Sequence, residues 1–240
     1  MPVAHFQETS VRVANMDCLK AAVELLPGGA WHTPSATPGA SLNPLPVMIN
    51  MASARNPGGG YIRGANAQEE DLCRRTTLAP ALESAANRGA YPWPSVCALY
   101  HPRVTVLRDD ARTRYAWLPF PMPVISVVSV AAVRHPDTVE RRHELRLTER
   151  EVGFQAVVEA VRGKIRYLLA TCAAKGHTRL VLSALGCGAY KNPPKHVAQL
   201  FHSELRRFGG VFETVVFAIL DDHLGRNFRP FAAVFGDACV

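Results

Sequence analysis

The chain has 240 residues, of which 48% are hydrophobic and 20% are charged. This length and composition are typical of one large globular domain, or at most two small ones, with a sizeable core. No apolar run approaches the length of about 20 residues that a membrane span needs. The first residues also lack the basic and apolar stretches of a secretory signal. We therefore expect no membrane partner and an intracellular, cytoplasmic location.

Charge and cysteine content indicate which partners to expect. The net charge of +7 favours a polyanionic partner, because opposite charges steer such a molecule toward the protein. This charge does not distinguish nucleic acid from another phosphate polymer, and it is also compatible with a role in solubility alone. The six cysteines form no C-x-x-C pair and no Cys/His spacing that suits zinc, so we expect reduced thiols and no bound metal.

The predicted elements begin with a helix at residues 14–26, which Pro27-Gly28-Gly29 ends. Five prolines among Gly, Ser and Thr then predict a loop over residues 27–46. Runs of β-branched and apolar residues predict strands at 47–51, 104–107, 124–133, 180–183 and 215–220. Apolar spacing and helix-ending signals predict helices at 68–87, 151–175 and 193–208. The last helix has Asn192 as its expected N-cap and Pro193 at its first position.

Helices and strands alternate through the second half of the chain, and several strands are apolar on both faces. This pattern predicts an α/β fold with a largely parallel sheet that helices cover on both sides. No internal repeat or domain boundary interrupts the pattern, so we expect residues 1–240 to form a single domain. Ligands of such sheets bind beyond the carboxyl ends of the strands. Two glycine-bearing segments, 56–60 and 186–188, each follow a predicted strand, so we expect a binding site there.

The first glycine segment leads to a pair of carboxylates. Gly58, Gly59 and Gly60 allow left-handed backbone angles and the close approach of a ligand, although a flexible turn is the alternative. Glu69 and Glu70 stand at a predicted helix start, where the helix dipole favours negative charge. The same pair is suited to hydrolysis of an O-glycosidic bond, which needs a group that protonates the leaving oxygen and then activates water. If the pKa values of the two carboxyl groups are driven apart, one acts as the acid and the other holds ribose hydroxyls.

The second glycine segment is suited to binding a diphosphate. Gly186 and Gly188 allow a tight turn whose amides point inward beside the N-terminus of the helix predicted at 193–208. The spacing is neither G-x-x-x-x-G-K-[ST] nor G-x-G-x-x-G, so P-loop nucleotide hydrolases and dinucleotide dehydrogenases lose support. Tyr190 would lie against a ribose or, alternatively, pack in the core. We interpret Cys187 as a small loop residue, because no histidine is placed to activate its thiol.

Together these segments resemble a known family. The stretch from Asn56 to Glu70 contains three glycines, a seven-residue spacer and then Gln-Glu-Glu, which is similar to the signature of the poly(ADP-ribose) glycohydrolases. The residues that flank this stretch, and Gly-Cys-Gly-Ala-Tyr-Lys-Asn at 186–192, resemble the bacterial-type, or microbial, branch. Arg108-Asp109-Asp110 and residues 215–221 also fit that branch. The resemblance therefore extends from about residue 10 to residue 235.

The resemblance implies a macrodomain-like fold, a three-layer α/β/α sandwich with a mixed, largely parallel central sheet. It implies hydrolysis of the ribose–ribose bond of poly(ADP-ribose), either free or on ADP-ribosylated protein, with ADP-ribose as the product and no metal or cofactor. Glu70 would be the catalytic acid and base through an oxocarbenium-like transition state, and Glu69 would bind the ribose at the scissile bond. Asn56 would hold the distal ribose, and Tyr190 would shape the site. The implied substrate-binding residues are Asn56, Gly58, Gly59, Gly60, Gln68, Gly186, Cys187, Gly188, Ala189 and Tyr190.

The sequence leaves three other functions open. One is a hydrolase that removes a single ADP-ribose from protein or nucleic acid, with the same pocket and a different acceptor side. A second is an ADP-ribose-binding module without activity, which would not need both carboxylates. A third is a basic nucleic-acid-binding protein, which no recognisable motif indicates.

Two features of substrate recognition also stay open. Residues 27–46 and 134–136 differ from the family pattern, which leaves the choice between terminal and internal cleavage of the polymer undecided. The residues that would support the adenine are not identified. The candidates, each of which is equally a candidate core residue, are Phe217, Asn227, Phe228, Phe231 and Phe235.

Overall fold

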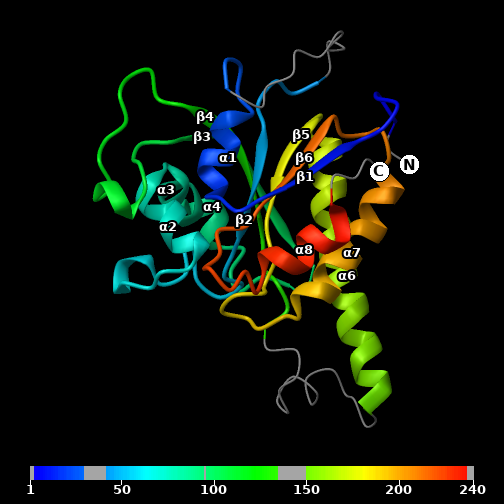
Figure 1. Ribbon diagram of the computed structural model, residues 1–240. Helices are drawn as coiled ribbons and strands as arrows, with labels where there is room; N and C mark the ends of the chain where they lie inside the picture. Colours follow the sequence, from blue (N-terminus) through cyan, green and yellow to red (C-terminus); the bar gives the residue numbers. More distant parts are fainter. Residues whose placement is uncertain (1–2, 30–41, 95, 135–149, 237–240) are drawn as a thin grey trace.

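The structure is a computed structural model that describes residues 3–29, 42–94, 96–134 and 150–236 (Figure 1). Within these residues the strands form one six-stranded sheet with the order β1-β6-β5-β2-β4-β3. The strands are β1 (Ser10–Ala14), β2 (Val47–Met51), β3 (Ala98–Thr105), β4 (Val124–Val130), β5 (Arg179–Leu182) and β6 (Thr214–Ala218). All neighbouring strands are parallel except β3 and β4, which are antiparallel. The expected mixed, largely parallel sheet is confirmed.

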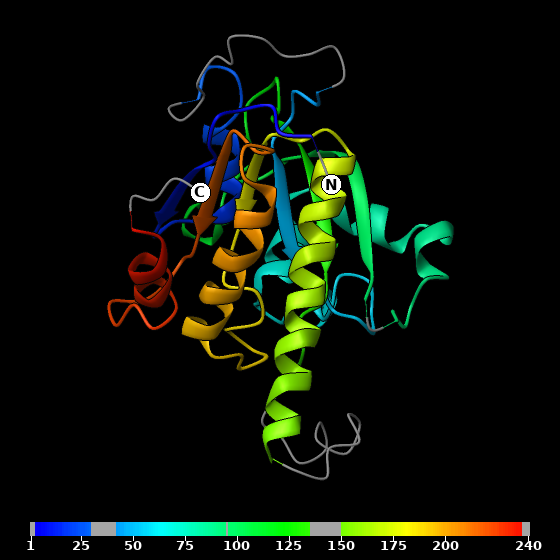
Figure 2. The same cartoon turned by 90° about the vertical axis from the view of Figure 1, so that its right-hand side faces the viewer.

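Helices cover both faces of the sheet and form the outer layers of the expected α/β/α sandwich (Figures 1 and 2). One face carries α1 (Cys18–Glu24), α2 (Gln68–Arg75) and α3 (Leu78–Glu83), and the short α4 (Ala85–Arg88) follows along the chain. The other face carries α6 (Arg150–Ala174), α7 (Pro194–Leu205) and α8 (Phe228–Phe235). None of the helices in the described residues has the length and apolarity that a membrane span needs.

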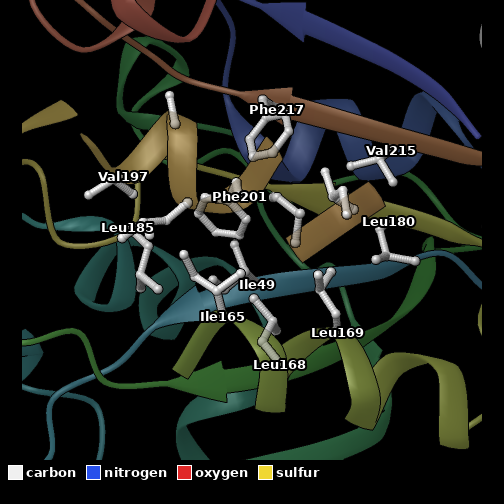
Figure 3. Close-up of a cluster of buried hydrophobic side chains, with 14 of the residues drawn as sticks. Ile49, Ile165, Leu168, Leu169, Leu180, Leu185, Val197, Phe201, Val215 and Phe217 are labelled. Carbon is white, nitrogen blue, oxygen red and sulfur yellow. The ribbon is translucent and has the colours of Figure 1, made fainter. Parts of the chain in front are cut away.

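Successive strand residues pack alternately into the two helix layers. Leu180, Val215 and Phe217 belong to the core under α6, α7 and α8, where Phe201 of α7 lies edge-on to Phe217 at 5.2 Å between ring centroids (Figure 3). Val216 belongs to the opposite core. Burial of one such side chain contributes about 1.5–3 kcal/mol. Packing on both faces therefore holds the strands in place, and with them the loops that follow the strand ends.

The single helix expected at 68–87 is interrupted, so that prediction was wrong. α2 ends at Arg75, and Thr76 has extended backbone angles (φ −139°, ψ 174°). Thr76 forms an antiparallel bridge with Val106, and the N–H of Thr77 donates to the carbonyl oxygen of Thr105 at 3.1 Å. This pairing with the end of β3 outweighs the local helix propensity, which is a weak preference.

Other element boundaries also differ from the expectation. The helix predicted at 14–26 begins only at Cys18, because β1 continues to Ala14. The strand predicted at 104–107 begins at Ala98, where the chain already pairs with β4. β1 and α8 were not predicted from the sequence, whereas the other predicted elements agree within a few residues. Of the predicted loop at 27–46, residues 30–41 lie outside the described part of the chain.

Candidate active site

A cleft of about 1070 Å³ lies at the carboxyl ends of the parallel strands. Its wall contains residues that follow β1, β2, β4, β5 and β6, together with the first turn of α2. Figure 1 shows the segments after β2, β5 and β6 gathered at the lower edge of the sheet. In open parallel sheets this edge is where ligands bind, because the connecting loops diverge there. It is also the edge at which the sequence predicts a ligand.

Glu70, the third residue of α2, is tied to the glycine segment by its carboxylate. Oε1 accepts a hydrogen bond of 3.0 Å from the N–H of Gly60, and Oε2 accepts one of 3.1 Å from the N–H of Ala67. Gly59 has a positive φ of 62°, and a Cβ there would collide with Oε1 of Glu70 and lie 3.1 Å from Oε2 of Glu69. The glycine therefore supplies both the left-handed turn and the space that lets two carboxylates converge on one point of the loop.

Glu69 is buried, with 2% of its surface exposed. Its Oε2 accepts a hydrogen bond of 2.7 Å from the N–H of Ser53, and its Oε1 accepts one of 3.3 Å from Nδ2 of Asn50. Burial raises the pKa of Glu69 to about 7, against the opposing effect of these hydrogen bonds. The raised pKa thus belongs to the glutamate that the family resemblance links to ribose binding.

Gln68 begins α2 and bonds to the backbone of β2. Its Oε1 accepts from the N–H of Met51 at 2.7 Å, and its Nε2 donates to the carbonyl oxygen of Ile49 at 2.9 Å. The side chain also lines the cleft. Because both ends of its amide bond to β2, Gln68 is suited to hold the start of α2 in position. Its direct contact with the substrate stays a prediction.

The second glycine segment makes a tight turn after β5. Gly186 has a positive φ of 74°, and a Cβ there would lie 2.6 Å from Cβ of Ala132 and 2.6 Å from Nδ2 of Asn192. Asn192 is not the N-cap of α7, a position that Pro193 takes. Instead, Nδ2 of Asn192 donates to the carbonyl oxygen of Val133 at 2.7 Å and to that of Gly186 at 3.1 Å. The predicted cap was wrong because this side chain locks the turn to the end of β4.

Gly188 differs from Gly186 in its surroundings. A Cβ at Gly188 would have no heavy-atom neighbour within 4 Å, and its φ is not in the left-handed region. The backbone N–H groups of Gly188, Ala189 and Tyr190 donate to no acceptor in the described part of the protein, and all three residues line the cleft. These groups are available to an anion, as the sequence predicts for a diphosphate loop.

Two further residues of this segment were singled out from the sequence. Cys187 is buried, and burial raises the pKa of its thiol to about 12, which makes it a poor nucleophile. Tyr190 is half-buried and lines the cleft, and the guanidinium of Arg134 lies 6.0 Å from its ring centroid. Tyr190 is therefore not a core aromatic.

The predicted residues divide into two groups by position. Those in the cleft wall are Gln68, Glu69, Glu70, Gly186, Gly188, Ala189 and Tyr190. Those outside the wall, within the described residues, are Asn56, Gly58, Gly59, Gly60 and Cys187. Asn56 is exposed, and its carbonyl oxygen accepts a hydrogen bond of 3.0 Å from the N–H of Gly59. This bond belongs to the glycine turn and not to the cleft.

Two carboxylates of the cleft wall, Asp17 and Asp71, were not predicted from the sequence, and they bind an arginine that does not itself line the cleft. Arg75 is 2% exposed, and its guanidinium pairs with Asp71 at 2.7 Å and with Asp17 at 2.8 Å. Nearby in the wall, hydrogen bonds from Arg112 hold the pKa of Asp110 well below its usual range. The spacing of four residues between Asp71 and Arg75 was the available sequence signal, since such pairs meet on a helix surface.

The candidates for an adenine platform are largely core residues. Phe217 and Phe231 are fully buried and Phe235 is 2% exposed, and the three rings contact one another. Phe228 packs against the same core, whereas Asn227 lines the cleft. Within the described residues no group of three or more His, Cys, Asp and Glu is arranged to hold a metal ion.

Comparison with known proteins agrees with this geometry. The model of the microbial-type poly(ADP-ribose) glycohydrolase (PARG) catalytic domain matches residues 2–109. The crystal structure of Thermomonospora curvata PARG bound to the inhibitor ADP-HPD is 30% identical in sequence, and the match covers 95% of this chain and 79% of that one with a TM-score of 0.71. The chain belongs to the microbial-type PARG family.

Other PARG structures give the same result. The crystal structure of Deinococcus radiodurans PARG in complex with ADP-ribose is 29% identical, covers 98% of this chain and 87% of that one, and has a TM-score of 0.76. No curated protein matches the chain. The family expected from the sequence is therefore confirmed, and this protein is an enzyme of the glycoside hydrolase class with the macrodomain-like fold.

Proposed function

We propose that this protein hydrolyses the ribose–ribose O-glycosidic bond of poly(ADP-ribose) and releases ADP-ribose, with Glu70 as general acid and base. The observation that carries the proposal is the bonding of Glu70 in the cleft wall, where backbone N–H groups hold both of its oxygens. Such bonds orient a catalytic group before the substrate arrives, which lowers the entropic part of the barrier. Each oxygen keeps a lone pair for a proton or for substrate.

In the proposed reaction, Glu70 first donates a proton to the oxygen that joins the two riboses. The bond between this oxygen and the anomeric carbon breaks, and an oxocarbenium-like species forms. The carboxylate of Glu70 then removes a proton from water, whose oxygen attacks the anomeric carbon. Because Glu70 loses one proton and regains one, it ends the cycle as it began it.

The loop at residues 186–190 supports this chemistry by binding the diphosphate. Its N–H groups at Gly188, Ala189 and Tyr190 are available to an anion at the cleft wall. The negative charge of a bound diphosphate would stabilise the positive oxocarbenium-like transition state.

Glu69 is proposed to bind ribose hydroxyls. With a pKa of about 7, its carboxyl group is partly protonated near neutral pH and can both donate and accept hydrogen bonds. Bonds from Ser53 and Asn50 fix its orientation, as binding of a ribose in one pose requires. Asn56 and the triple-glycine turn are still proposed to contact the substrate. Because these residues lie outside the cleft wall, such contacts would require the turn to close on the substrate.

The direct test of the activity is incubation of the purified protein with automodified poly(ADP-ribosyl)ated protein, with free ADP-ribose followed over time. We expect release of ADP-ribose together with loss of long chains. Intact polymer, with ADP-ribose binding still measurable, would contradict the proposal. That result would favour the removal of single ADP-ribose units or a binding module without activity.

The test of the residue is Glu70→Gln. Loss of a general acid–base group lowers kcat by about 10²–10⁴-fold, while the dissociation constant for ADP-ribose should stay within about threefold because the anion-binding loop is unchanged. Glu159→Gln is a matched control, since this side chain is 65% exposed on α6. Turnover of Glu70→Gln at the wild-type rate would exclude the proposed role.

We also propose that the protein works inside the cell. The cysteines of the described residues are free, as is usual in reducing compartments. Titration of thiols in the denatured protein should therefore give the same count with and without prior reduction. A higher count after reduction would contradict this location.

A further inference from the structure

Three exposed cations lie on segments that reach the catalytic end of the cleft. Arg55, Arg134 and Lys191 follow β2, β4 and β5, respectively, so they come from three different loops. In the described part of the chain none of them has a carboxylate within ion-pair distance. Their charges are therefore available to an anion in solution.

These cations are close, along the chain or in space, to residues that bind the carboxylate pair or line the cleft. Arg55 lies two residues beyond Ser53, whose N–H binds Glu69. The guanidinium of Arg134 lies 6.0 Å from the ring centroid of Tyr190, and Lys191 is the next residue along the chain. Tyr190 itself lines the cleft.

The electrostatics of Tyr190 agree with this proximity. Burial raises the pKa of its hydroxyl, the charges of Glu69 and Glu70 raise it further, and the charges of Arg134 and Arg55 lower it. The hydroxyl of Tyr190 is therefore within electrostatic range of both carboxylates and both arginines. The cations are therefore close to the place where, on the proposed function, the glycosidic bond is broken.

The polymer places a second diphosphate on the far side of that bond. When a chain is bound with its scissile bond at Glu70, one ADP-ribose unit fills the cleft and its diphosphate meets the loop at residues 186–190. The next unit, which leaves with the ribose oxygen, carries another diphosphate with a charge of about −2. A single ADP-ribose attached to a protein side chain has no such second diphosphate.

We propose that Arg55, Arg134 and Lys191 form an acceptor-side subsite that binds the diphosphate of the departing ADP-ribose unit. The subsite rests on the proposed function, because it requires the scissile bond at Glu70. Exposed cations add affinity for a phosphate chain, because each phosphate that they neutralise releases counterions. The subsite therefore makes the enzyme prefer the polymer to protein-linked single ADP-ribose.

The experiment compares the binding of two ligands, ADP-ribose and a purified chain of two ADP-ribose units, to the Glu70→Gln protein, which is expected not to degrade them. We expect the two-unit chain to bind about tenfold more tightly than ADP-ribose at low salt. Addition of Arg55→Gln and Arg134→Gln should remove most of this ratio and leave the ADP-ribose affinity within about twofold. The slope of log affinity against log salt for the two-unit chain should fall by about 0.7 for each cation removed, which is the value for single strands.

Arg206→Gln supplies the matched control. Arg206 is exposed in the 3-10 helix Arg206–Phe208, which follows α7 at the end remote from the 186–190 loop. This variant loses the same charge and should keep the ratio of affinities. Equal affinity of the Glu70→Gln protein for both ligands would overturn the subsite. An equal loss of affinity for both ligands in the arginine variants would also overturn it, because the arginines would then bind the unit in the cleft. Failure of the proposed function would appear separately, as no release of ADP-ribose from polymer by the wild type.

Discussion

The side-chain oxygen of Gln68 accepts a hydrogen bond of 2.7 Å from the backbone N–H of Met51. The same amide donates to the carbonyl oxygen of Ile49, so the first residue of α2 bonds to β2 much as a neighbouring strand would. The two residues that follow Gln68 are Glu69 and Glu70. The position of the carboxylate pair is therefore set by a link to the sheet, and a helix that shifted along β2 would carry both carboxylates with it.

Gln68→Ala should disturb both stability and turnover. It leaves the N–H of Met51 and the carbonyl oxygen of Ile49 without partners, at a cost of about 2–4 kcal/mol in the free energy of unfolding. It should also lower kcat, because the start of α2 is no longer fixed. Urea unfolding and polymer hydrolysis measure the two effects, and Gln155→Ala, an exposed position on α6, is the control. A Gln68→Ala protein as stable and active as this control would contradict the link.

Gly59→Ala should separate backbone strain from the collision with Glu70. Gly59 and Gly64 both have positive φ, 62° and 83°, but a Cβ at Gly64 has no neighbour within 4 Å. Alanine at either position should cost about 1 kcal/mol in stability from the left-handed angle. Only Gly59→Ala should also lower kcat, by about tenfold or more, because the new methyl group displaces the Glu70 carboxylate. The prediction fails if the two variants hydrolyse the polymer at the same rate.

Gly188→Ala should affect ligand binding and not folding. Its Cβ would enter open space in the cleft wall at an ordinary φ, so the melting temperature should stay at the wild-type value. If a diphosphate approaches the N–H groups of this loop, the methyl group should weaken ADP-ribose binding by about tenfold, or 1.4 kcal/mol. Gly186→Ala is the contrasting variant, since its Cβ would meet Ala132 and Asn192 at 2.6 Å and should destabilise the fold. If calorimetry finds the wild-type affinity for ADP-ribose in Gly188→Ala, the loop does not bind the diphosphate.

Glu69 should make the stability of the ligand-free protein depend on pH. Its folded pKa of about 7 lies above the unfolded value of about 4.3. Between these values the folded chain binds more protons than the unfolded chain, so the free energy of unfolding falls as pH rises, by up to ~4 kcal/mol. Glu69→Gln should flatten this part of the pH profile, whereas Glu159→Gln should not. Urea unfolding between about pH 4.5 and 7.5 measures the slope, and equal slopes for the wild type and Glu69→Gln would show that the pKa is not raised.

Local sequence determined most of the secondary structure and the two loops. β2 agrees with its prediction because its first three residues, Val47 to Ile49, are apolar and pack alternately into the two helix layers. The glycine turns were recognisable because the positive φ at Gly59 and Gly186 favours glycine, which has no Cβ to strain in that region. The family followed from the same residues, since three glycines and Gln-Glu-Glu at a fixed spacing are a local pattern.

Tertiary contacts decided what the local pattern left open. The break after Arg75 depends on the pairing of Thr76 with Val106, and the role of Asn192 depends on the carbonyl oxygen of Val133, which is remote along the chain. The sequence also predicts that one carboxyl group has a raised pKa but not which one. Burial, which only the packed fold defines, assigns the raised pKa to Glu69.

The cleft itself is the clearest example of this division. The sequence predicts that two glycine loops meet at one sheet edge, because they follow parallel strands. It does not predict the buried Arg75 between Asp17 and Asp71, nor the position of Arg134 near the ring of Tyr190. These residues come from segments far apart in the chain, and the order of the strands in the sheet brings them together. Backbone conformation is a local property that residue types reveal, whereas charge placement and burial are set by strand order and packing.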